Sequence, residues 1–285
     1  MRIALFQQQS SDHAGENIAA AEAAIRSAVQ QGAEIVCLQE LFASPYFPQH
    51  ESPTNFDLAE PVPGPTTERM QKLASELSVV LIVPVFERRA AGLYHNSAVI
   101  IDSDGSLAGH YRKMHLPDDP GFSEKFYFSP GDVGFFATDT RAGRIGVLIC
   151  WDQWFPEAAR LAALDGAEII FYPTAIGWVP DEDNTERAAS REAWITIQRS
   201  HAIANGIYVA AANRVGREGQ IEFYGSSFVC DPRGSVLAEA SQNASEVLIA
   251  DCPAGEIERQ RRGWPFLRDR RFDAYGDLAR QFRRR

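Results

Sequence analysis

Cys150 is the residue of this chain best placed to attack a carbonyl carbon. It directly follows an apolar run at residues 145–149 and precedes Trp-Asp-Gln-Trp-Phe-Pro-Glu. This pattern predicts a buried strand over residues 145–150 that ends at a thiol, in a sharp turn before a helix. Such a turn exposes a side chain at the sheet edge and leaves backbone N–H groups free beside it. The alternative is a buried structural cysteine, the commoner fate of a single cysteine.

Three charged residues could serve such a thiol. Glu40 ends the apolar run 33–39, where burial would raise its pKa toward that of a useful general base. Lys113, in Tyr-Arg-Lys-Met-His, could stabilise an oxyanion. Glu124 lies in an aromatic-rich loop with Pro-Gly at both ends, and loops of this kind often carry function. Each could instead be a solvated surface charge, with Glu124 paired to Lys125.

Glu40, Lys113 and Cys150, in this order and in these local sequences, resemble the Glu-Lys-Cys triad of the nitrilase superfamily of carbon–nitrogen hydrolases. The resemblance extends from residues 1–7 to residues 264–271. Within the family, segments 38–47, 111–122 and 150–160 are most similar to N-carbamoylputrescine amidases. Glu124 matches the family's second glutamate, which positions the lysine and the reacting groups.

The resemblance implies a thiol-dependent reaction at the ureido carbon of N-carbamoylputrescine, a step of polyamine biosynthesis. Glu40 takes the proton of Cys150, and Lys113 with the backbone N–H of Trp151 binds the oxyanion. Glu40 then protonates the departing nitrogen and activates the water that resolves the thioester. The expected products are putrescine, carbon dioxide and ammonia, with no cofactor.

The substrate pocket is expected to combine aromatic walls with acids at its far end. Asp118 and Asp119 are candidates to meet a distal ammonium. The expected wall residues are Tyr46, Phe47, Trp151, Trp154, Thr174, Ala175 and Trp178. The alternative places the aromatic rings in the core and the aspartates in solvent.

One loop departs from the family pattern. After Pro-Thr-Ala-Ile-Gly at residues 173–177, the chain has Trp178 and Val179 where N-carbamoylputrescine amidases carry Ser-Glu-Pro. A substrate-facing acid is therefore missing there, although Asp181, Glu182 and Asp183 follow closely. The departure puts the exact amine in question and leaves the chemistry untouched.

Other functions remain open. A carboxylate-tailed substrate, as in a β-ureidopropionase, would need an Arg or Lys at the far end of the pocket, and none can be placed there from the sequence. An ω-amidase and a nitrilase keep the same triad. A catalytically idle binding homologue is disfavoured because Glu40, Lys113, Glu124 and Cys150 are all present. A Ser-His-Asp hydrolase is disfavoured because Gly-x-Ser-x-Gly is absent.

Strand and helix patterns alternate along the chain, and two segments recur. Residues 31–36 resemble residues 165–170, and residues 97–107 resemble residues 227–237. We infer two halves with the same order of elements, each a sheet with helices outside, packed face to face. This is the four-layer α-β-β-α sandwich that the family also implies; chance similarity of short segments is the alternative. Helices are expected over 17–31, 66–77, 157–164 and 186–205, and strands over 2–7, 33–39, 79–87, 96–102, 145–150, 167–173, 207–213, 226–231 and 247–251.

Composition bounds the partners. The 285 residues carry a net charge of −10, which disfavours nucleic acids and anionic membranes and suits a cationic substrate. No signal peptide, membrane span or metal-binding motif is recognised. The four cysteines show no Cys-x-x-Cys spacing, so a reducing cytoplasm is expected. We expect a single domain over 1–285, with an Arg-rich arm at 255–285 that makes subunit contacts in a homodimer or larger homo-oligomer.

Overall fold

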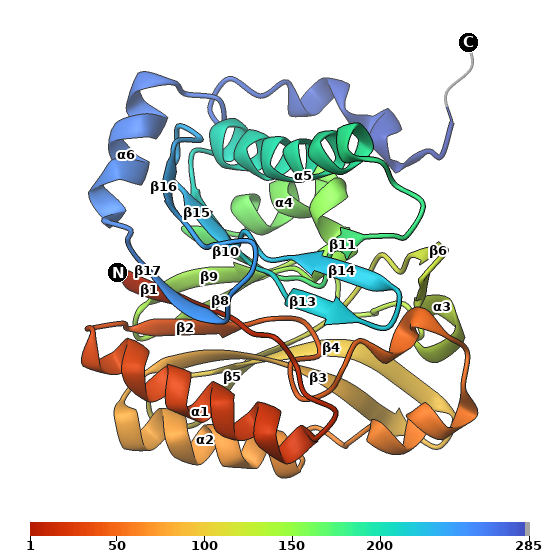
Figure 1. Cartoon of the computed structure of the whole chain (residues 1–285). Coiled ribbons are helices and arrows are strands. Elements are labelled where there is room, and N and C mark those ends of the chain that lie inside the picture. Colours follow the sequence, from red (N-terminus) through yellow and green to blue (C-terminus); the bar gives the residue numbers. More distant parts are fainter. Residues whose placement is uncertain (283–285) are drawn as a thin grey trace.

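The computed structural model describes residues 1–282 and has two six-stranded sheets that pack face to face between outer helices (Figure 1). The first sheet contains, in spatial order, β17 (Glu246–Asp251), β1 (Arg2–Gln7), β2 (Ile35–Leu38), β3 (Val80–Ala90), β4 (Leu93–Ile101) and β5 (Leu107–Arg112). The second contains β16 (Val236–Glu239), β15 (Phe228–Cys230), β12 (Tyr208–Ala212), β10 (Ile169–Pro173), β9 (Gly143–Val147) and β8 (Ala137–Thr140).

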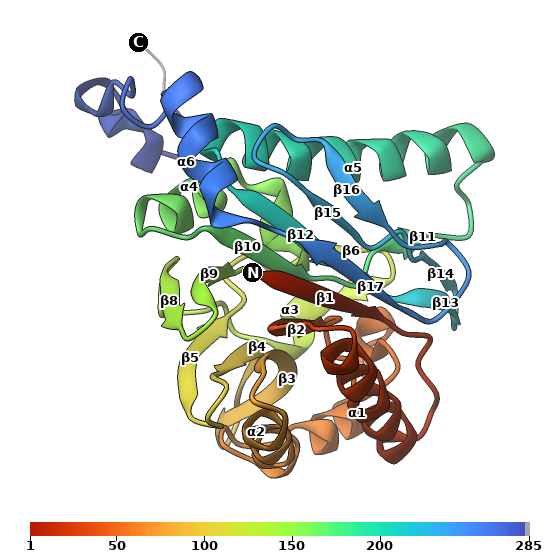
Figure 2. The same cartoon turned by 90° about the vertical axis from the view of Figure 1, so that its left-hand side faces the viewer.

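Helices cover the outer face of each sheet, as Figure 2 shows from the side. The first sheet carries α1 (Ala14–Gln30) and α2 (Pro65–Leu77), and the second carries α4 (Pro156–Leu164) and α5 (Asn184–Asn205). The helix α6 (Ala254–Gly263) follows β17 and leads into the C-terminal segment, which contains η4 (Phe272–Ala274) and η5 (Gly276–Ala279). The predicted α-β-β-α sandwich is therefore confirmed.

The two halves repeat the same order of elements, as predicted. Strands β1, β2 and β3 run parallel, and so do β9, β10 and β12. In each half two antiparallel strands follow, β4 and β5 or β15 and β16. Even the recurring turns agree, because Gly105 and Gly234 both have positive φ and donate to Asp102 and Asp231 over 2.8 Å.

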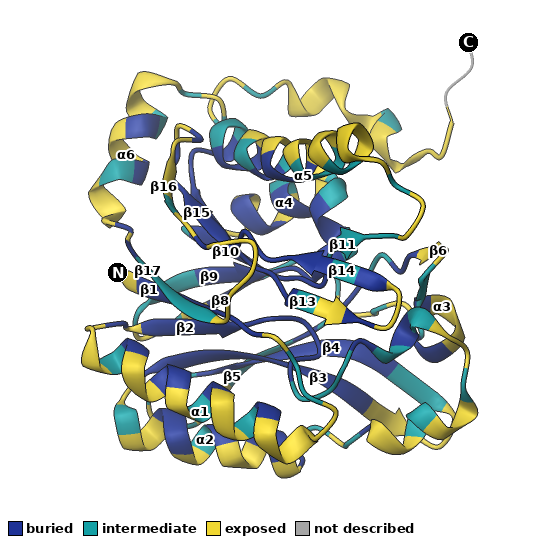
Figure 3. Cartoon of the chain, in the orientation of Figure 1, coloured by how far each residue is buried: buried dark blue, intermediate teal, exposed yellow. Residues whose placement is uncertain are grey.

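The core lies in three layers that follow from the side-chain alternation of the strands. On β1, Ile3 and Leu5 pack between the two sheets, whereas Ala4 and Phe6 pack against the helices α1 and α2. Figure 3 shows the buried sheet interior beneath helices whose outer faces are exposed. Burial of each large aliphatic side chain contributes about 1.5–3 kcal/mol, so the interface between the sheets is a major source of stability.

Capping residues mark the ends of α5 more accurately than hydrophobic periodicity does. The helix α5 begins after Asp183, whose side chain accepts the N–H groups of Thr185 and Glu186, and ends at Gly206 with φ of 59°. The helix α1 begins three residues earlier than predicted. All four predicted helices and all nine predicted strands are present, and most of them have shifted ends.

One predicted strand is wrong at its end, and several short elements were not predicted. The strand expected over 145–150 ends at Val147, and Cys150 opens the 3₁₀ helix η3 (Cys150–Trp154). The cause is Asp152, whose carboxylate accepts the N–H of Ile149 and turns the chain. The strands β5, β8 and β16 and the helix α6 were not predicted. Other unpredicted elements are α3 (Glu124–Tyr127), η1 (Phe47–Gln49), η2 (Pro53–Leu58), the pair β6 (Asp118–Asp119) and β7 (Phe122–Ser123), and the small sheet of β11 (Gly177–Trp178), β14 (Ile221–Tyr224) and β13 (Val215–Glu218).

Within residues 1–282, no helix combines the length and the apolar character needed to cross a bilayer.

Candidate active site

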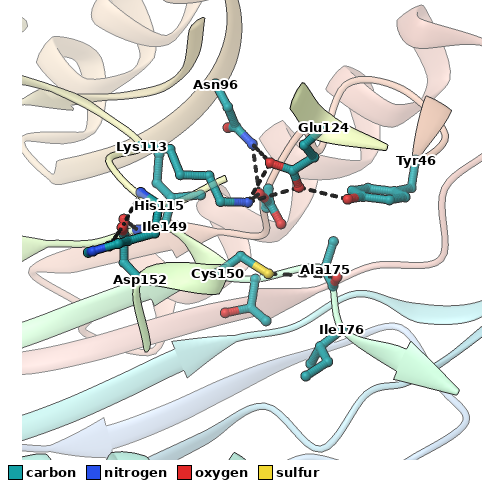
Figure 4. A network of polar contacts seen from close by, with 12 residues as sticks. Tyr46, Asn96, Lys113, His115, Glu124, Ile149, Cys150, Asp152, Ala175 and Ile176 are labelled. Atoms are coloured by element: carbon teal, nitrogen blue, oxygen red, sulfur yellow. Dashed lines mark hydrogen bonds and ion pairs between the residues drawn. The ribbon is translucent and has the colours of Figure 1, made fainter. Parts of the chain in front are cut away.

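A buried cluster of charged side chains forms where strands of the first sheet end. Lys113 follows β5, Glu40 follows β2 by two residues, and Glu124 opens α3. The Nζ of Lys113 lies 2.8 Å from Oε1 of Glu40 and 2.7 Å from Oε2 of Glu124 (Figure 4). All three side chains are 0% exposed, so each ion pair acts without solvent screening.

Two neutral residues complete the cluster. The Nδ2 of Asn96, on β4, donates to Oε1 of Glu40 over 2.7 Å, and the hydroxyl of Tyr46 donates to Oε1 of Glu124 over 2.7 Å (Figure 4). The second oxygen of Glu40, Oε2, is buried without a hydrogen-bond partner. Because buried polar atoms are nearly always paired, this free oxygen is suited to receive a proton or a ligand.

Burial and mutual charge set the protonation of the cluster. Burial alone would lower the pKa of the Lys113 ammonium, but Glu124 and Glu40 outweigh it and hold that pKa above its ordinary value. Burial and the nearby charge of Glu40 raise the pKa of Glu124 to about 7, against the opposing effect of Lys113. The ammonium is therefore permanently charged, while Glu124 can take up a proton near neutrality.

Cys150 stands at a strained turn opposite this cluster. Its φ is 44°, a left-handed conformation that a non-glycine residue rarely adopts. Asp152 supports the turn, because it accepts hydrogen bonds from the Ile149 N–H over 2.9 Å and the Tyr111 hydroxyl over 2.7 Å. Its other oxygen accepts the His115 N–H over 3.0 Å, so the turn is tied to the chain just beyond Lys113.

Cys150 is 5% exposed. Its Sγ points to the carbonyl oxygen of Ala175, which lies 3.7 Å away (Figure 4). Burial and the charge of Glu40 raise the pKa of this thiol well above its ordinary value, although Lys113 opposes them. The resting thiol is therefore protonated, and a base must remove its proton as it attacks.

A cavity of about 300 Å³ opens on Cys150. Its walls are mostly apolar, and Asp119 and Glu182 are the charged side chains among the described residues that line it. The hydroxyl of Tyr224, on β14, is buried without a partner beside this cavity. The lining residues are Pro117, Asp119, Pro120, Phe122, Cys150, Trp151, Trp154, Ala175, Ile176, Gly177, Val179, Glu182, Ser190, Ala193 and Tyr224.

The structure brings some of the predicted substrate residues to this cavity. Asp119, Trp151, Trp154 and Ala175 line it. Tyr46 instead lies in the charged cluster, where it holds Glu124.

Four other predicted substrate residues lie outside the lining. Phe47 stacks on Phe86 with ring centroids 5.0 Å apart. Thr174 is buried and donates to the carbonyl of Tyr172, because a hydroxyl in the interior needs an acceptor. The indole N–H of Trp178 donates to the carbonyl of Arg187, and the residue is not part of the lining. Asp118 is exposed.

Several site residues escaped sequence reasoning. Asn96 is the first residue of a predicted strand and Tyr224 ends the unpredicted strand β14, and only the fold shows which face they occupy. Asp152 follows Cys150 by two residues, and a buried acid beside a thiol was a usable signal. Within residues 1–282, no group of three or more His, Cys, Asp or Glu side chains is arranged to hold a metal ion, and independence of cofactors stays a prediction.

Comparisons with known proteins agree with this geometry. The model of the carbon–nitrogen hydrolase family matches residues 2–262. N-carbamoylputrescine amidase of Solanum lycopersicum is 46% identical, over 96% of this chain and 93% of its own length, and citrullinase of Francisella tularensis is 40% identical, over 99% of each chain. A crystal structure of a carbon–nitrogen hydrolase from Helicobacter pylori has a TM-score of 0.96 at 46% identity, covering 99% of both chains. This chain therefore belongs to the carbon–nitrogen hydrolase family, that is, to the nitrilase superfamily.

Proposed function

We propose that this enzyme hydrolyses the ureido C–N bond of N-carbamoylputrescine to give putrescine, carbon dioxide and ammonia. The observation that carries the proposal is the cavity, which opens on the thiol of Cys150 and combines apolar walls with acidic side chains. The charges of Glu40 and Lys113 act on that thiol from the buried cluster. A tetramethylene chain suits the walls, and a terminal ammonium suits Asp119 and Glu182. Relatives that are 46% identical over nearly the whole chain carry this activity in their names.

The first chemical step is attack by Cys150. Its thiol keeps its proton at rest, and the free Oε2 of Glu40 accepts that proton as Sγ bonds to the ureido carbon. The electron pair of the C=O bond moves to oxygen, where Lys113 and the N–H of Trp151 stabilise the negative charge. Trp151 is the second residue of η3, and N–H groups in the first turn of a helix lack partners within it.

The second step expels a nitrogen and resolves the covalent intermediate. The oxyanion collapses, the C–N bond breaks, and the proton held by Glu40 moves to the departing nitrogen. Water then gives a proton to Glu40 and attacks the thioester-type carbonyl, and the returned proton restores the thiol of Cys150. The resulting carbamate decomposes to carbon dioxide and the second nitrogen product.

Glu124 and Tyr46 support this chemistry by holding Lys113. The bonds from Nζ to both oxygens of Glu124 fix the ammonium in place, and Tyr46 fixes Glu124 in turn. Burial and the charge of Glu40 raise the pKa of Glu124 to about 7, so this carboxyl can exchange a proton near neutral pH.

The loop that departs from the family pattern has an acid in a different position. Glu182 lines the cavity, and its Oε2 accepts the N–H of Val179 over 2.9 Å, which fixes the loop. We assign to Glu182 the contact with the distal ammonium that residues 178 and 179 cannot make. Asp119 lies in the wall of the same cavity and is the second candidate.

A carboxylate-bearing ureido substrate fits less well. Citrulline and N-carbamoyl-β-alanine both carry a carboxylate that would need a cationic partner. Among the described residues that line the cavity, none is Lys, Arg or His. An unpaired carboxylate facing Glu182 would cost binding free energy, so the cavity disfavours both compounds.

The test is ammonia release from purified enzyme with N-carbamoylputrescine, citrulline, N-carbamoyl-β-alanine and simple amides. We expect the highest kcat/KM with N-carbamoylputrescine. Preference for citrulline or for N-carbamoyl-β-alanine would overturn the assignment of the tail site and leave the triad standing. Absence of turnover with every compound would favour a binding role.

We also propose that the enzyme assembles as a homodimer or larger homo-oligomer through its C-terminal arm, residues 255–285, of which 283–285 lie outside the described residues. The arm exposes several large apolar side chains, and α4 exposes Leu161 and Leu164. Contiguous exposed apolar surface is typical of subunit interfaces. The exposed arm residues are Trp264, Phe266, Phe272, Tyr275, Leu278 and Phe282. Light scattering of the Phe272→Asp variant tests this, with a smaller particle expected than for the wild type.

We place the enzyme in the reducing cytoplasm. All four cysteines are free thiols, and a thiol nucleophile requires reducing conditions. Fractionation of cells that produce the tagged protein checks this.

A further inference from the structure

Arg214 is a fully buried arginine that contacts the loop carrying Glu40. It follows β12 of the second sheet by two residues and is 0% exposed. Its Nη2 donates to the carbonyl oxygens of Glu40 and Leu41, each over 3.0 Å. Its Nη1 donates to the carbonyl oxygen of Ser44, also over 3.0 Å. A side chain of the second half therefore binds three backbone oxygens of a first-half loop.

Glu218 connects the same guanidinium to the other end of the loop. Its Oε1 lies 2.8 Å from Nη1 of Arg214, and its Oε2 accepts the backbone N–H of Tyr46 over 2.6 Å. The ion pair of Arg214 and Glu218 thus holds residues 40–46 at both ends. Glu40 and Tyr46 are also the residues whose side chains contact Lys113 and Glu124 in the charged cluster.

The loop has a physical need for this support. Leu41 has a φ of 49°, and a left-handed leucine persists only where its surroundings enforce it. The carbonyl groups of residues 40, 41 and 44 lie beyond the end of β2, outside the sheet ladder. A guanidinium offers several fixed donors, which match such a set of diverging acceptors better than an ammonium does.

Stability alone is a weak explanation for the pair. Two charges buried together lose hydration, and an apolar replacement of similar volume is often as stable or more so. The contacts that this pair makes lead specifically to Glu40 and Tyr46. Its placement is therefore better explained by the geometry of the catalytic cluster.

We propose that Arg214 and Glu218 are positioning residues that hold the Glu40 carboxylate and the Tyr46 hydroxyl in register with Lys113 and Cys150. The proposal rests on the catalytic role assigned to Glu40. The neighbouring Asn213 acts on the other side of the thiol, because its amide binds both the N–H and the C=O of Ile176 over 3.0 Å. One strand end of the second half thus fixes the backbone on both sides of Cys150.

The test uses Arg214→Lys and Glu218→Gln, with Arg199→Lys as the matched control. Arg199 also binds a backbone carbonyl, that of Gly234 over 2.6 Å, and it lies outside the lining of the cavity. Three quantities are measured for each variant: kcat and KM for N-carbamoylputrescine, the rate at which iodoacetamide alkylates Cys150, and Tm. The alkylation rate depends on proton removal by Glu40 and needs no substrate, so it remains informative if the proposed substrate is wrong.

We expect Arg214→Lys to lower kcat and the alkylation rate by about 100-fold, because a displacement of about 1 Å at a reacting group costs this much. KM should change little, and Glu218→Gln should follow with a smaller loss. Arg199→Lys should keep wild-type values of all but Tm. The kcat values are normalised to the concentration of titratable thiol. The proposal would be overturned if the variants have a lower Tm but keep the wild-type kcat and alkylation rate. If Arg214→Lys does not fold, the result for Glu218→Gln decides by the same criteria.

Discussion

The two halves of the molecule share one backbone plan and differ in the residues that come after their strands. After β2 the first half places Glu40, whereas after β10 the second places Thr174 and Ala175. After β1 comes Gln8, and after β9 the chain turns into Cys150. The two halves therefore have equivalent positions after their strands. In the first half these positions contribute to the charged cluster, and in the second half they provide the nucleophile.

The halves also differ by an insertion. In the first half β3 leads directly into its antiparallel neighbour β4, whereas in the second the hairpin of β13 and β14 comes between β12 and β15. That hairpin carries Tyr224 to the cavity and Glu218 to the loop of Glu40. The insertion thus gives the second half the substrate wall and the support for a first-half residue.

Replacement of one buried thiol in each half should separate the roles of the two halves most clearly. Cys150→Ala removes the proposed nucleophile and should lower kcat by about 10⁴-fold or more, since a covalent mechanism cannot run without it. Cys37→Ala, in β2 of the first half, removes a thiol that is also buried. It should reduce Tm and leave kcat within a few-fold. Similar turnover for the two variants, measured as ammonia release, would contradict the assignment.

Glu40→Gln tests the first half in the same way. Glutamine has the shape of the glutamate side chain and keeps a weaker contact to Lys113. It cannot accept the proton of Cys150. We expect kcat to fall by about 10³-fold, within the range of general-base effects. The exposed Glu51→Gln serves as the control and should behave like the wild type. If the double variant with Cys150→Ala is no worse than Cys150→Ala alone, the two halves act on one step.

Sequence reasoning succeeded where a pattern is local. The apolar runs before Glu40 and Cys150 predicted strands, and the repeated Asp-x-x-Gly-Ser turns predicted the two halves. The strand before Cys150 was predicted too long because the turn depends on Asp152, whose carboxylate reaches the N–H of Ile149. A hydrogen bond of this kind, from a backbone N–H to a side chain, produces no periodic pattern of hydrophobic residues from which it could be predicted.

The remaining site residues depend on which side chains the fold brings together. Arg214 and Glu40 are separated by 174 positions and meet because the two halves pack face to face. Phe47 and Trp178 were expected in the substrate wall on the basis of residue type alone. Their rings fill neighbouring apolar clusters instead, and residue type does not distinguish these two fates.

The cavity wall of the second half gives a smaller and more specific test. Glu182→Gln should raise KM for N-carbamoylputrescine about tenfold, because one charge-assisted hydrogen bond to the distal ammonium is lost. The adjacent Asp183→Asn keeps a good helix cap for α5 and should leave KM unchanged. An N-carbamoyl alkylamine without a distal charge serves as the control substrate in steady-state kinetics, since its KM should be insensitive to Glu182→Gln. Equal losses with both substrates would remove Glu182 from the ammonium site.

The last prediction concerns how the stability of the protein depends on pH. We expect Glu124, in the first half, to contribute most to this dependence. Glu124 has a folded pKa of about 7, above its ordinary value of 4.5, so the folded protein binds this proton more tightly than the unfolded chain. Stability from this group is complete below about pH 4.5 and is lost as the pH rises through 7. Glutamine cannot ionise, so the Tm of Glu124→Gln minus that of the wild type should become more positive from pH 5 to pH 8. Glu51→Gln should show no such trend, because its carboxylate is solvated in both states. A difference that falls with pH would mean that Lys113 outweighs burial at Glu124 and keeps this carboxylate ionised.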